Sequence, residues 1–218
     1  PYMGASGMGA KLSKYVKDNY PDSKSDLFAV FIEKCGQMAK KNGYQAMITQ
    51  HAWMFLGSFE RMRHQKLQDT IINCAHLGTR AFEEIGGEVV QTVAIVFRVC
   101  NCCNYISRFM RLVNEQSQKA KEQLFLKQTS IYDVSRKLYE RIPGSPIAYW
   151  IGEKMSDAFS EKLLGDYAQT KQGFATGNND LFLRYWQEVN FEKIGLPLFT
   201  RERALTSGKK WFPCNKGG

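Results

Sequence analysis

Three short, almost unbroken apolar runs are the feature that most constrains how this chain can fold. They cover residues 44–49, 70–77 and 89–99, and the last reads Val-Val-Gln-Thr-Val-Ala-Ile-Val-Phe-Arg-Val. Strands buried on both faces have this continuous apolar character, whereas half-exposed strands alternate apolar and polar residues. The three runs therefore predict a sheet that is covered by helices on both faces.

Helical patterns alternate with the first two of these runs. A helix expected over residues 26–40 can be capped by Ser25 or Asp26, and a second helix is expected over residues 55–67. The first helix carries apolar side chains at helical spacing, at Leu27, Val30, Phe31, Cys35 and Met38. Two strands then follow in succession, so the order predicts an α/β fold whose sheet has an antiparallel strand or hairpin at one edge.

The composition changes near residue 100, where polar and charged residues become more frequent. Helical patterns dominate from there onward, and the expected helices cover residues 107–127, 131–141 and 147–164. We therefore expect a boundary somewhere in residues 105–130. It would divide an α/β part, residues 1–105, from a mainly helical region, residues 106–218.

The net charge of the chain indicates which kinds of partner it could bind. Lysine and arginine number 30 against 21 acidic residues, which gives a formal net charge of +9. Such an excess favours a polyanion such as nucleic acid or an anionic membrane surface, although many basic domains bind neither. No apolar run approaches the ~20 residues that a transmembrane helix needs, so we expect no membrane span.

Six cysteines are distributed without a regular disulfide framework, at Cys35, Cys74, Cys100, Cys102, Cys103 and Cys214. Free thiols in a reducing cytoplasm are the simplest account of them. Three of the six cluster at residues 100–103, but a zinc site needs a second pair of Cys or His ligands. His51, His64 and His76 are scattered along the chain, so we expect no metal site.

The first two residues, Pro1 and Tyr2, become informative through the segments that come after them. A Pro-Tyr pair alone has no specificity and could belong to any loop. Here it opens a glycine-rich stretch that runs to Lys11, and the amphipathic helix and the turn from Lys41 into the first apolar run come next. This order resembles the second half of an amino-methyltransferase that acts on adenine in DNA, a family whose catalytic loop reads Asn/Asp-Pro-Pro-Tyr. The resemblance implies that the chain is a fragment that begins inside this loop.

Two longer stretches narrow the family. One runs from Ala75 to Gln91, and the other runs from Gly173 to Asp180 and is joined by the ending over residues 210–218. Together they resemble the large adenine-specific methyltransferases of bacterial BREX phage-defence systems, which are relatives of fused type II restriction–modification enzymes. The resemblance covers most of the chain. It implies the C-terminal half of a Rossmann-like methyltransferase sheet with flanking helices over residues 1–105, and then a helical linker and the start of a target-recognition region over residues 106–218.

The resemblance also implies roles for particular residues. Tyr2 would stack on an adenine that has left the duplex, with Pro1 beside it in the catalytic loop, and Phe82 would face the base from the opposite side. A packing role in the core or in a hairpin is the alternative for Phe82. The residues expected to contact double-stranded DNA, with ordinary surface positions as the alternative, are Lys11, Gly177, Asn178, Lys209 and Lys210.

S-adenosylmethionine is the methyl donor that the resemblance implies. In this family its main binding motif lies upstream of the catalytic loop, so we expect the fragment alone to have little or no activity. The implied partners are double-stranded DNA and other proteins of the defence system, and the implied location is the bacterial cytoplasm.

Two other interpretations stay open. One is a non-catalytic DNA-binding or scaffold segment with a degenerate methyltransferase fold, which would bind DNA in a salt-sensitive way without selecting adenine. The other is an unrelated α/β protein whose motifs match by chance.

Overall fold

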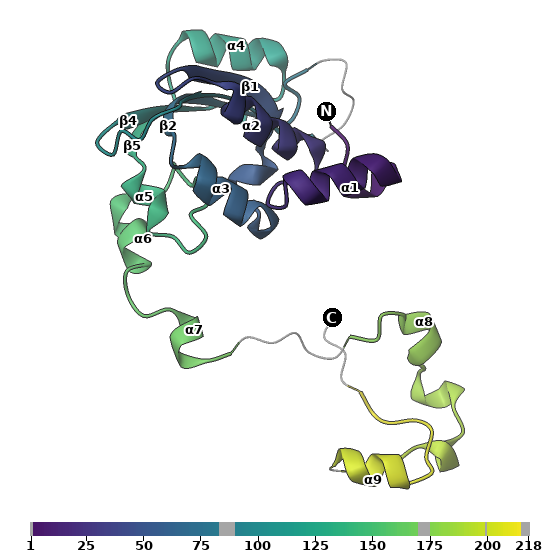
Figure 1. Cartoon of the computed structure of the whole chain (residues 1–218). Coiled ribbons are helices and arrows are strands. Elements are labelled where there is room, and N and C mark those ends of the chain that lie inside the picture. Colours follow the sequence, from purple (N-terminus) through teal and green to yellow (C-terminus); the bar gives the residue numbers. More distant parts are fainter. Residues whose placement is uncertain (1, 83–89, 170–174, 199, 215–218) are drawn as a thin grey trace. The chain divides into compact units, whose positions relative to one another are not determined.

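The computed structural model describes residues 2–82, 90–169, 175–198 and 200–214 (Figure 1). The chain divides into two compact units, Pro1–Leu163 and Leu164–Gly218. Each unit is considered by itself below.

Unit 1 is built on a five-stranded sheet with the strand order β1-β3-β2-β4-β5. The strands are β1 (Tyr44–Gln50), β2 (Thr70–Gly78), β3 (Thr92–Arg98), β4 (Ile106–Arg111) and β5 (Ile131–Ser135). β3 is antiparallel to both β1 and β2, β2 and β4 are parallel, and β5 is antiparallel to β4. Strands β1, β2 and β4 therefore all run in one direction, and their carboxyl ends share one edge of the sheet.

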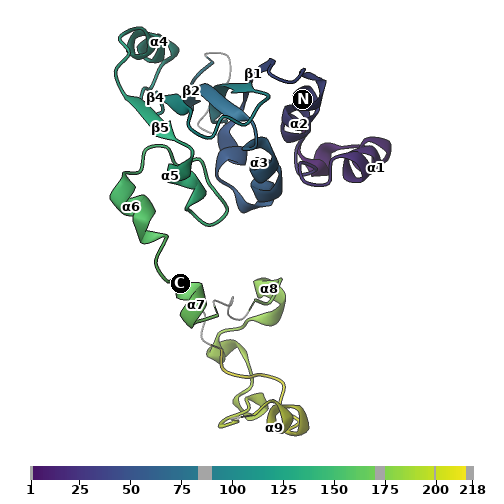
Figure 2. The ribbon, with the colours of Figure 1, turned by 60° about the vertical axis from the view of Figure 1, so that its left-hand side comes forward.

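The helices of unit 1 are α1 (Ala10–Asn19), α2 (Leu27–Met38), α3 (Glu60–Lys66), α4 (Gln118–Leu126), α5 (Lys137–Glu140) and α6 (Glu153–Ala158). Short 3-10 turns η1 (Ala5–Gly7), η2 (His51–Met54) and η3 (Gly57–Phe59) join them. Figures 1 and 2 show α3 and α4 on opposite faces of the sheet. The mixed α/β architecture predicted from the sequence is confirmed.

The main hydrophobic core lies between one face of the sheet and the elements that cover it. Side chains of α2, η2 and α3 pack there against β3, where Ile95 and Phe97 are buried. The segment around Tyr149 completes this core, and its ring stacks on Phe109 of β4 with the centroids 4.4 Å apart. The buried residues of this core range from Phe28 to Tyr149, so the core forms only when distant parts of unit 1 come together.

The expected helix after Asp26 is present. The Asp26 side chain accepts a hydrogen bond from the backbone N–H of Phe28 at 3.1 Å, which satisfies a donor that the first helical turn leaves free. The helix is followed by a turn in which Asn42 has a positive φ of 65°, a conformation that asparagine tolerates better than most residues. The chain can therefore reverse directly into β1.

The third apolar run forms an interior strand of the sheet. β3 lies between β1 and β2 and bonds to both. The apolar character of residues 92–98 reflects this interior position, since both edges of β3 are paired and Val93, Ile95 and Phe97 are buried on one of its faces. An antiparallel strand does occupy one edge, and it is β5.

The helix expected over residues 107–127 is wrong in its first part, and so is the start of the helix expected over residues 131–141. Strands β4 and β5 occupy these positions, and only α4 and α5 are helical. The charges that indicated a solvent-exposed helix instead pair across two strands: the guanidinium of Arg108 donates to both carboxylate oxygens of Asp133 at 2.9 Å. The expected helix over residues 147–164 is reduced to α6 and the first residue of α7.

The sheet thus continues past the boundary expected in residues 105–130, because β4 pairs with β2. The compact unit ends at Leu163 instead. A role of the later residues in target recognition stays a prediction.

Unit 2 consists of short elements. They are α7 (Leu164–Tyr167), α8 (Asn179–Phe182), η4 (Trp186–Glu188), η5 (Phe191–Lys193) and α9 (Arg201–Thr206). A single bridge between Ile194 and Trp211 links distant parts of its described residues. Within the described ranges of both units, no helix is long and apolar enough to cross a membrane.

Candidate functional site

Tyr2 is held at the carboxyl end of β1. Its hydroxyl donates a hydrogen bond to the backbone carbonyl of Ile48 at 3.0 Å, across 46 residues of sequence. The next residues are also attached, because the N–H of Leu27 donates to the carbonyl of Met3 and the N–H of Ala5 donates to the carbonyl of Ser25. The side chain of Tyr2 is nevertheless 54% exposed, so its ring is available to a ligand. Pro1 lies outside the described residues.

Phe82 follows β2 and is 41% exposed. Gly78 ends that strand with a φ of +70°, and a Cβ atom there would lie only 3.0 Å from the Cα of Val113. A glycine is therefore required for the chain to turn away from the sheet toward Phe82. β1 and β2 are separated by β3, so their backbones are about 10 Å apart.

The structure thus attaches Tyr2 near the carboxyl end of β1, whereas Phe82 follows the carboxyl end of the parallel strand β2 by four residues. This is the edge at which open α/β sheets bind their ligands. No direct contact between the two rings occurs among the described residues. The stacking roles of Tyr2 and Phe82 stay predictions.

A histidine pair lies at the same edge, and sequence reasoning missed it. Nδ1 of His51, the first residue after β1, is 2.7 Å from Nε2 of His76 near the end of β2. Nδ1 of His76 is 2.9 Å from the hydroxyl of Tyr149. The two histidines looked scattered because they are 25 residues apart, but each follows or ends a predicted strand. Two parallel strands that end at the same edge of the sheet would have been the signal.

Aromatic side chains and one arginine surround this pair. The ring of Phe55 meets that of His51 edge-on at 5.4 Å, and the ring of Trp150 lies 6.4 Å from that of His76. The guanidinium of Arg111 lies over the ring of Trp150, 5.3 Å from its centre. Packing on this scale restricts the orientation of both imidazole rings.

Both histidines are held neutral near pH 7. Burial, together with the neighbouring His51, Arg111 and Lys121, lowers the pKa of His76 to about 3. Burial also lowers the pKa of His51. Two imidazole nitrogens at hydrogen-bond distance require one donor and one acceptor, which neutral rings provide.

The residues predicted to contact DNA fall in both units. Lys11 lies on α1 of unit 1 and is exposed, whereas Gly177, Asn178, Lys209 and Lys210 lie in unit 2. The side chain of Asn178 caps α8 by accepting from the N–H of Leu181, and Gly177 has a φ of +71°. Asn178 and Gly177 therefore have a structural role at the start of α8. A contact of these two residues with DNA stays a prediction.

Lys209 and Lys210 make different local contacts. Nζ of Lys209 donates to the carbonyl of Glu192 at 2.6 Å, and Nζ of Lys210 lies 5.2 Å from the centre of the Trp211 ring. Trp211 is half-buried, and a basic side chain beside an aromatic ring suits contact with a nucleic-acid backbone.

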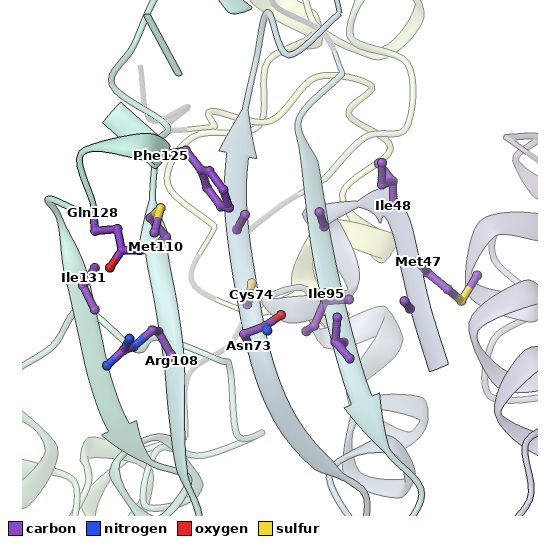
Figure 3. Close-up of a pocket in the computed structure, with 14 residues that line it drawn as sticks. Met47, Ile48, Asn73, Cys74, Ile95, Arg108, Met110, Phe125, Gln128 and Ile131 are labelled. Carbon is purple, nitrogen blue, oxygen red and sulfur yellow. The ribbon is translucent and has the colours of Figure 1, made fainter. Parts of the chain in front are cut away.

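A depression of about 520 Å³ lies on the face of the sheet that α4 partly covers (Figure 3). Its floor is made of small and apolar side chains of β1, β3 and β2, including Ala46, Ala94 and Ala75. Phe125 and Gln128 border it, and Arg108 lies within it. Apart from Arg108, which is already paired with Asp133, the lining offers few charged groups.

The cysteines are all free thiols. Sγ of Cys100 and Sγ of Cys102 approach to 3.3 Å at the end of β3 opposite to the candidate site. Within the described ranges, no group of three or more His, Cys, Asp and Glu side chains is arranged to hold a metal ion.

A known family matches the first part of the chain. Residues 1–81 match the family described as Eco57I restriction-modification methylase. The matched segment contains Tyr2, α2, β1, the histidine pair and nearly all of the path to Phe82. This part of the chain is thus similar to methylases of the restriction–modification class.

Two relatives extend the match to the whole chain. The chain is 47% identical over 226 residues to the "Adenine-specific methyltransferase PglX" of Lacticaseibacillus casei (strain Zhang), and the match covers 100% of this chain and 19% of the relative. It is 39% identical over 221 residues to the "Adenine-specific methyltransferase BrxX" of Escherichia coli O9:H4 (strain HS), covering 100% of this chain and 18% of the relative. The chain is thus a homologue of the adenine-specific methyltransferases PglX and BrxX, and it spans about a fifth of their length.

These relatives confirm the predicted resemblance to adenine-specific methyltransferases and contradict an unrelated α/β protein. A solved structure of a type I restriction-modification system methyltransferase subunit from Streptococcus thermophilus is 14% identical and overlaps with a TM-score of 0.44. That overlap covers 69% of this chain and 36% of the subunit.

Proposed function

We propose that this chain supplies the base-binding part of an S-adenosylmethionine-dependent enzyme that methylates N6 of adenine in double-stranded DNA. The observation that carries the proposal is the attachment of Tyr2 to β1. The hydrogen bond to Ile48 holds the phenol at the carboxyl end of the sheet while its ring stays exposed. A rigidly held, exposed aromatic ring is the platform that a flipped base requires.

The chemistry explains why such a platform is needed. The lone pair of the exocyclic nitrogen of adenine is delocalised into the ring, so the nitrogen is a poor nucleophile until it becomes tetrahedral. The base must also leave the duplex stack before a methyl donor can reach it. In the proposal, Tyr2 and Phe82 hold the two faces of the extruded base, and the spacing of about 10 Å between β1 and β2 leaves room for it.

The described residues do not by themselves fit the methyl donor. β1 and β2 end at Gln50 and Gly78, and His51 and Thr79 follow them; none of these described residues offers a carboxylate that could hold the ribose hydroxyl groups. We therefore derive no step through S-adenosylmethionine. The proposal assigns its binding to other parts of a protein as long as PglX and BrxX.

The DNA partner, the cellular location and the biological role belong to the same proposal. The net charge of +9 suits a DNA partner, with Lys11, Gly177, Asn178, Lys209 and Lys210 as candidate contacts. Six free thiols suit the reducing bacterial cytoplasm. A role in phage defence or restriction–modification, with other proteins of the defence system, is proposed from the named relatives.

The test is methylation of duplex DNA by the full-length protein that carries this chain, with labelled S-adenosylmethionine. Tyr2→Ala should lower kcat/KM by roughly 5- to 150-fold, because stacking on an aromatic side chain contributes about 1–3 kcal/mol per base. Phe82→Ala should lower it less. Tyr2→Phe keeps the ring but loses the hydrogen bond to Ile48, so it should lower kcat/KM less than Tyr2→Ala does but should not leave it unchanged.

Tyr44→Ala is the matched control, because Tyr44 is an exposed tyrosine at the opposite end of β1. Its activity should equal that of the wild type. Equal losses in Tyr2→Ala and Tyr44→Ala would contradict the base-stacking role. Salt-sensitive DNA binding without any methyl transfer would favour a non-catalytic DNA-binding segment.

A further inference from the structure

Two cysteines in the connection between β3 and β4 have no role in the proposal above. The side chains of Cys100 and Cys102 are half-buried, and their sulfur atoms approach to 3.3 Å. The strand that leads to them ends at Arg98, which pairs with Tyr44 at the start of β1, whereas Tyr2 is attached near the end of β1. The thiol pair is therefore a separate feature at the opposite edge of the sheet.

A buried threonine explains why the two sulfur atoms meet. Thr70 is the first residue of β2, and β3 and β4 flank that strand on either side. Its hydroxyl donates to the carbonyl of Cys100 at 2.7 Å and accepts from the backbone N–H of Cys102 at 2.9 Å. Because Thr70 is only 5% exposed, water competes little for these two hydrogen bonds. The sheet thus holds the turn that brings both thiols to the same side of the chain.

The surroundings distinguish the two sulfur atoms. Hydrogen bonding from Cys100, together with Thr70 and Arg98, lowers the pKa of Cys102, whereas the pKa of Cys100 is raised, chiefly by the same hydrogen bond. The thiolate is the form of cysteine that attacks oxidants, and a neighbouring thiol can convert the oxidised product to a disulfide. Cys102 is therefore suited to attack, and Cys100 is suited to the second step.

We infer that Cys100 and Cys102 form a redox-active dithiol that a peroxide converts reversibly to a disulfide. The thiolate of Cys102 attacks one peroxide oxygen and the O–O bond breaks. Cys102 becomes a sulfenic acid, and the other oxygen leaves as hydroxide, which a proton converts to water. The sulfur of Cys100 then attacks the sulfur of Cys102, the S–O bond breaks, and the hydroxyl group leaves as water with the proton of the Cys100 thiol. The two sulfur atoms together lose two electrons, and the peroxide accepts them.

This chemistry agrees with a reducing compartment. Disulfides in a cytosol are transient, and an external dithiol returns them to thiols by exchange. A reversible disulfide also keeps Cys102 from the sulfinic and sulfonic acids, which the thiol pool cannot reduce. The inference does not depend on the proposed function.

The experiment uses the full-length protein that carries this chain, treated with hydrogen peroxide and then alkylated with iodoacetamide under denaturing conditions. Trypsin cleaves after Arg98 and Arg108 and releases residues 99–108, which contain Cys100, Cys102 and Cys103. After oxidation, mass spectrometry should find an alkyl group on Cys103 alone and a loss of two hydrogen atoms from the other two cysteines. Dithiothreitol added before alkylation should restore alkylation of all three.

Cys35 is the internal control, because it is a half-buried free thiol on α2, away from this segment. Its thiol should be lost at least about tenfold more slowly, since it has no neighbouring sulfur to complete a disulfide. Cys103→Ser should form the Cys100–Cys102 disulfide at the wild-type rate. In Cys100→Ser the second step is removed, so dimedone should label Cys102 as a sulfenic acid.

Two variants of Thr70 test its positioning role. Thr70→Val keeps the shape of the side chain but loses both hydrogen bonds, so it should slow disulfide formation by about tenfold. Thr70→Ser keeps the hydroxyl and should restore most of the rate. An unchanged rate in Thr70→Val would contradict the positioning role of Thr70.

The thiol pair itself has two decisive failures. Alkylation of Cys100, Cys102 and Cys103 alike, at a peroxide concentration that already oxidises Cys35, would overturn the inference. A disulfide that includes Cys103 in place of Cys100 or Cys102 would overturn it as well. Since no readout is methyl transfer, these results are independent of whether the proposed function is correct.

Discussion

The two units of the chain use the same kinds of side chain in opposite ways. In unit 1, large aromatic residues such as Trp53 and Tyr149 are completely buried and belong to one core. In unit 2, Tyr185 and Trp186 are more than 70% exposed. The described residues of unit 2 belong to no hydrophobic core cluster. Apolar composition is therefore not what separates the units.

The difference comes from the lengths and pairing of the elements. Unit 1 has a sheet whose strands are joined across the chain, which gives helices and loops a continuous surface to cover. The helices of unit 2 have four to six residues, about one turn each, and cannot present an extended apolar face. We conclude that unit 1 carries the folding stability of the chain and that unit 2 is suited to contact other surfaces.

The largest test of this comparison replaces one tryptophan in each unit. Trp53→Ala should lower the free energy of unfolding by about 3–5 kcal/mol, because Trp53 is 0% exposed and packs against Phe97. Trp186→Ala should change it by less than about 0.5 kcal/mol, since Trp186 is 76% exposed. Urea denaturation followed by far-ultraviolet circular dichroism measures both, and equal effects would contradict the comparison.

A buried and an exposed arginine provide the second test. The guanidinium of Arg63 donates to the carbonyls of Trp53, Leu56 and Gly144 in the interior of unit 1. Arg63→Met should cost about 2–4 kcal/mol, because these carbonyls lose their donor. Arg184 of unit 2 also donates to backbone carbonyls, but at the surface.

Arg184→Met is therefore the matched control for Arg63→Met. Water can replace the donor that its carbonyls lose, so its effect should stay below about 0.5 kcal/mol. The same denaturation measurement applies to both variants. A larger loss in Arg184→Met than in Arg63→Met would mean that unit 2 is the more tightly packed unit.

The third test uses pH. The pKa of His76 is about 3 in the folded protein against 6.5 for a free histidine, so between these values the unfolded chain binds more protons than the folded one. Stability should therefore fall as the pH decreases from 6.5 toward 3, with a slope approaching about 1.4 kcal/mol per pH unit. His76→Gln should remove this contribution, whereas His64→Gln should keep the wild-type slope.

The smallest expected effect concerns DNA binding by unit 2. Replacing both Lys209 and Lys210 by glutamine should reduce the slope of the logarithm of affinity against the logarithm of salt concentration by about 0.9 for each phosphate that these lysines neutralise. Lys127→Gln, on unit 1 after α4, is the control. An unchanged slope in the double variant would remove these lysines from the DNA interface.

The elements predicted correctly from the sequence are those with strong local patterns. The amphipathic helix after Asp26 and the strands β1, β2 and β3 follow from periodicity and apolar runs that are visible within a few residues. β4 and β5 were missed because their outward residues are charged and polar. Arg108 and Asp133 lie opposite each other only after the two strands pair, across 25 residues.

Some residues of the candidate site were also predicted from the sequence, whereas others became visible only in the structure. Tyr2 and Phe82 were proposed from a resemblance, and the structure adds that both lie at the carboxyl edge of the sheet. The histidine pair could not be read from spacing, because His51, His76 and Tyr149 meet only through the order of the strands and the segment that follows α5.

The sequence by itself determined the early helices and strands, and through a resemblance it predicted the family and the aromatic residues proposed for a flipped base. Local periodicity and motif order are properties of neighbouring residues, so they are visible before folding. Only the tertiary structure decided that β3 is an interior strand, that the sheet extends to β5, and that His51 is aligned by His76 and Tyr149. Those features depend on contacts between distant residues, which form only when the strands pair and bury their shared core.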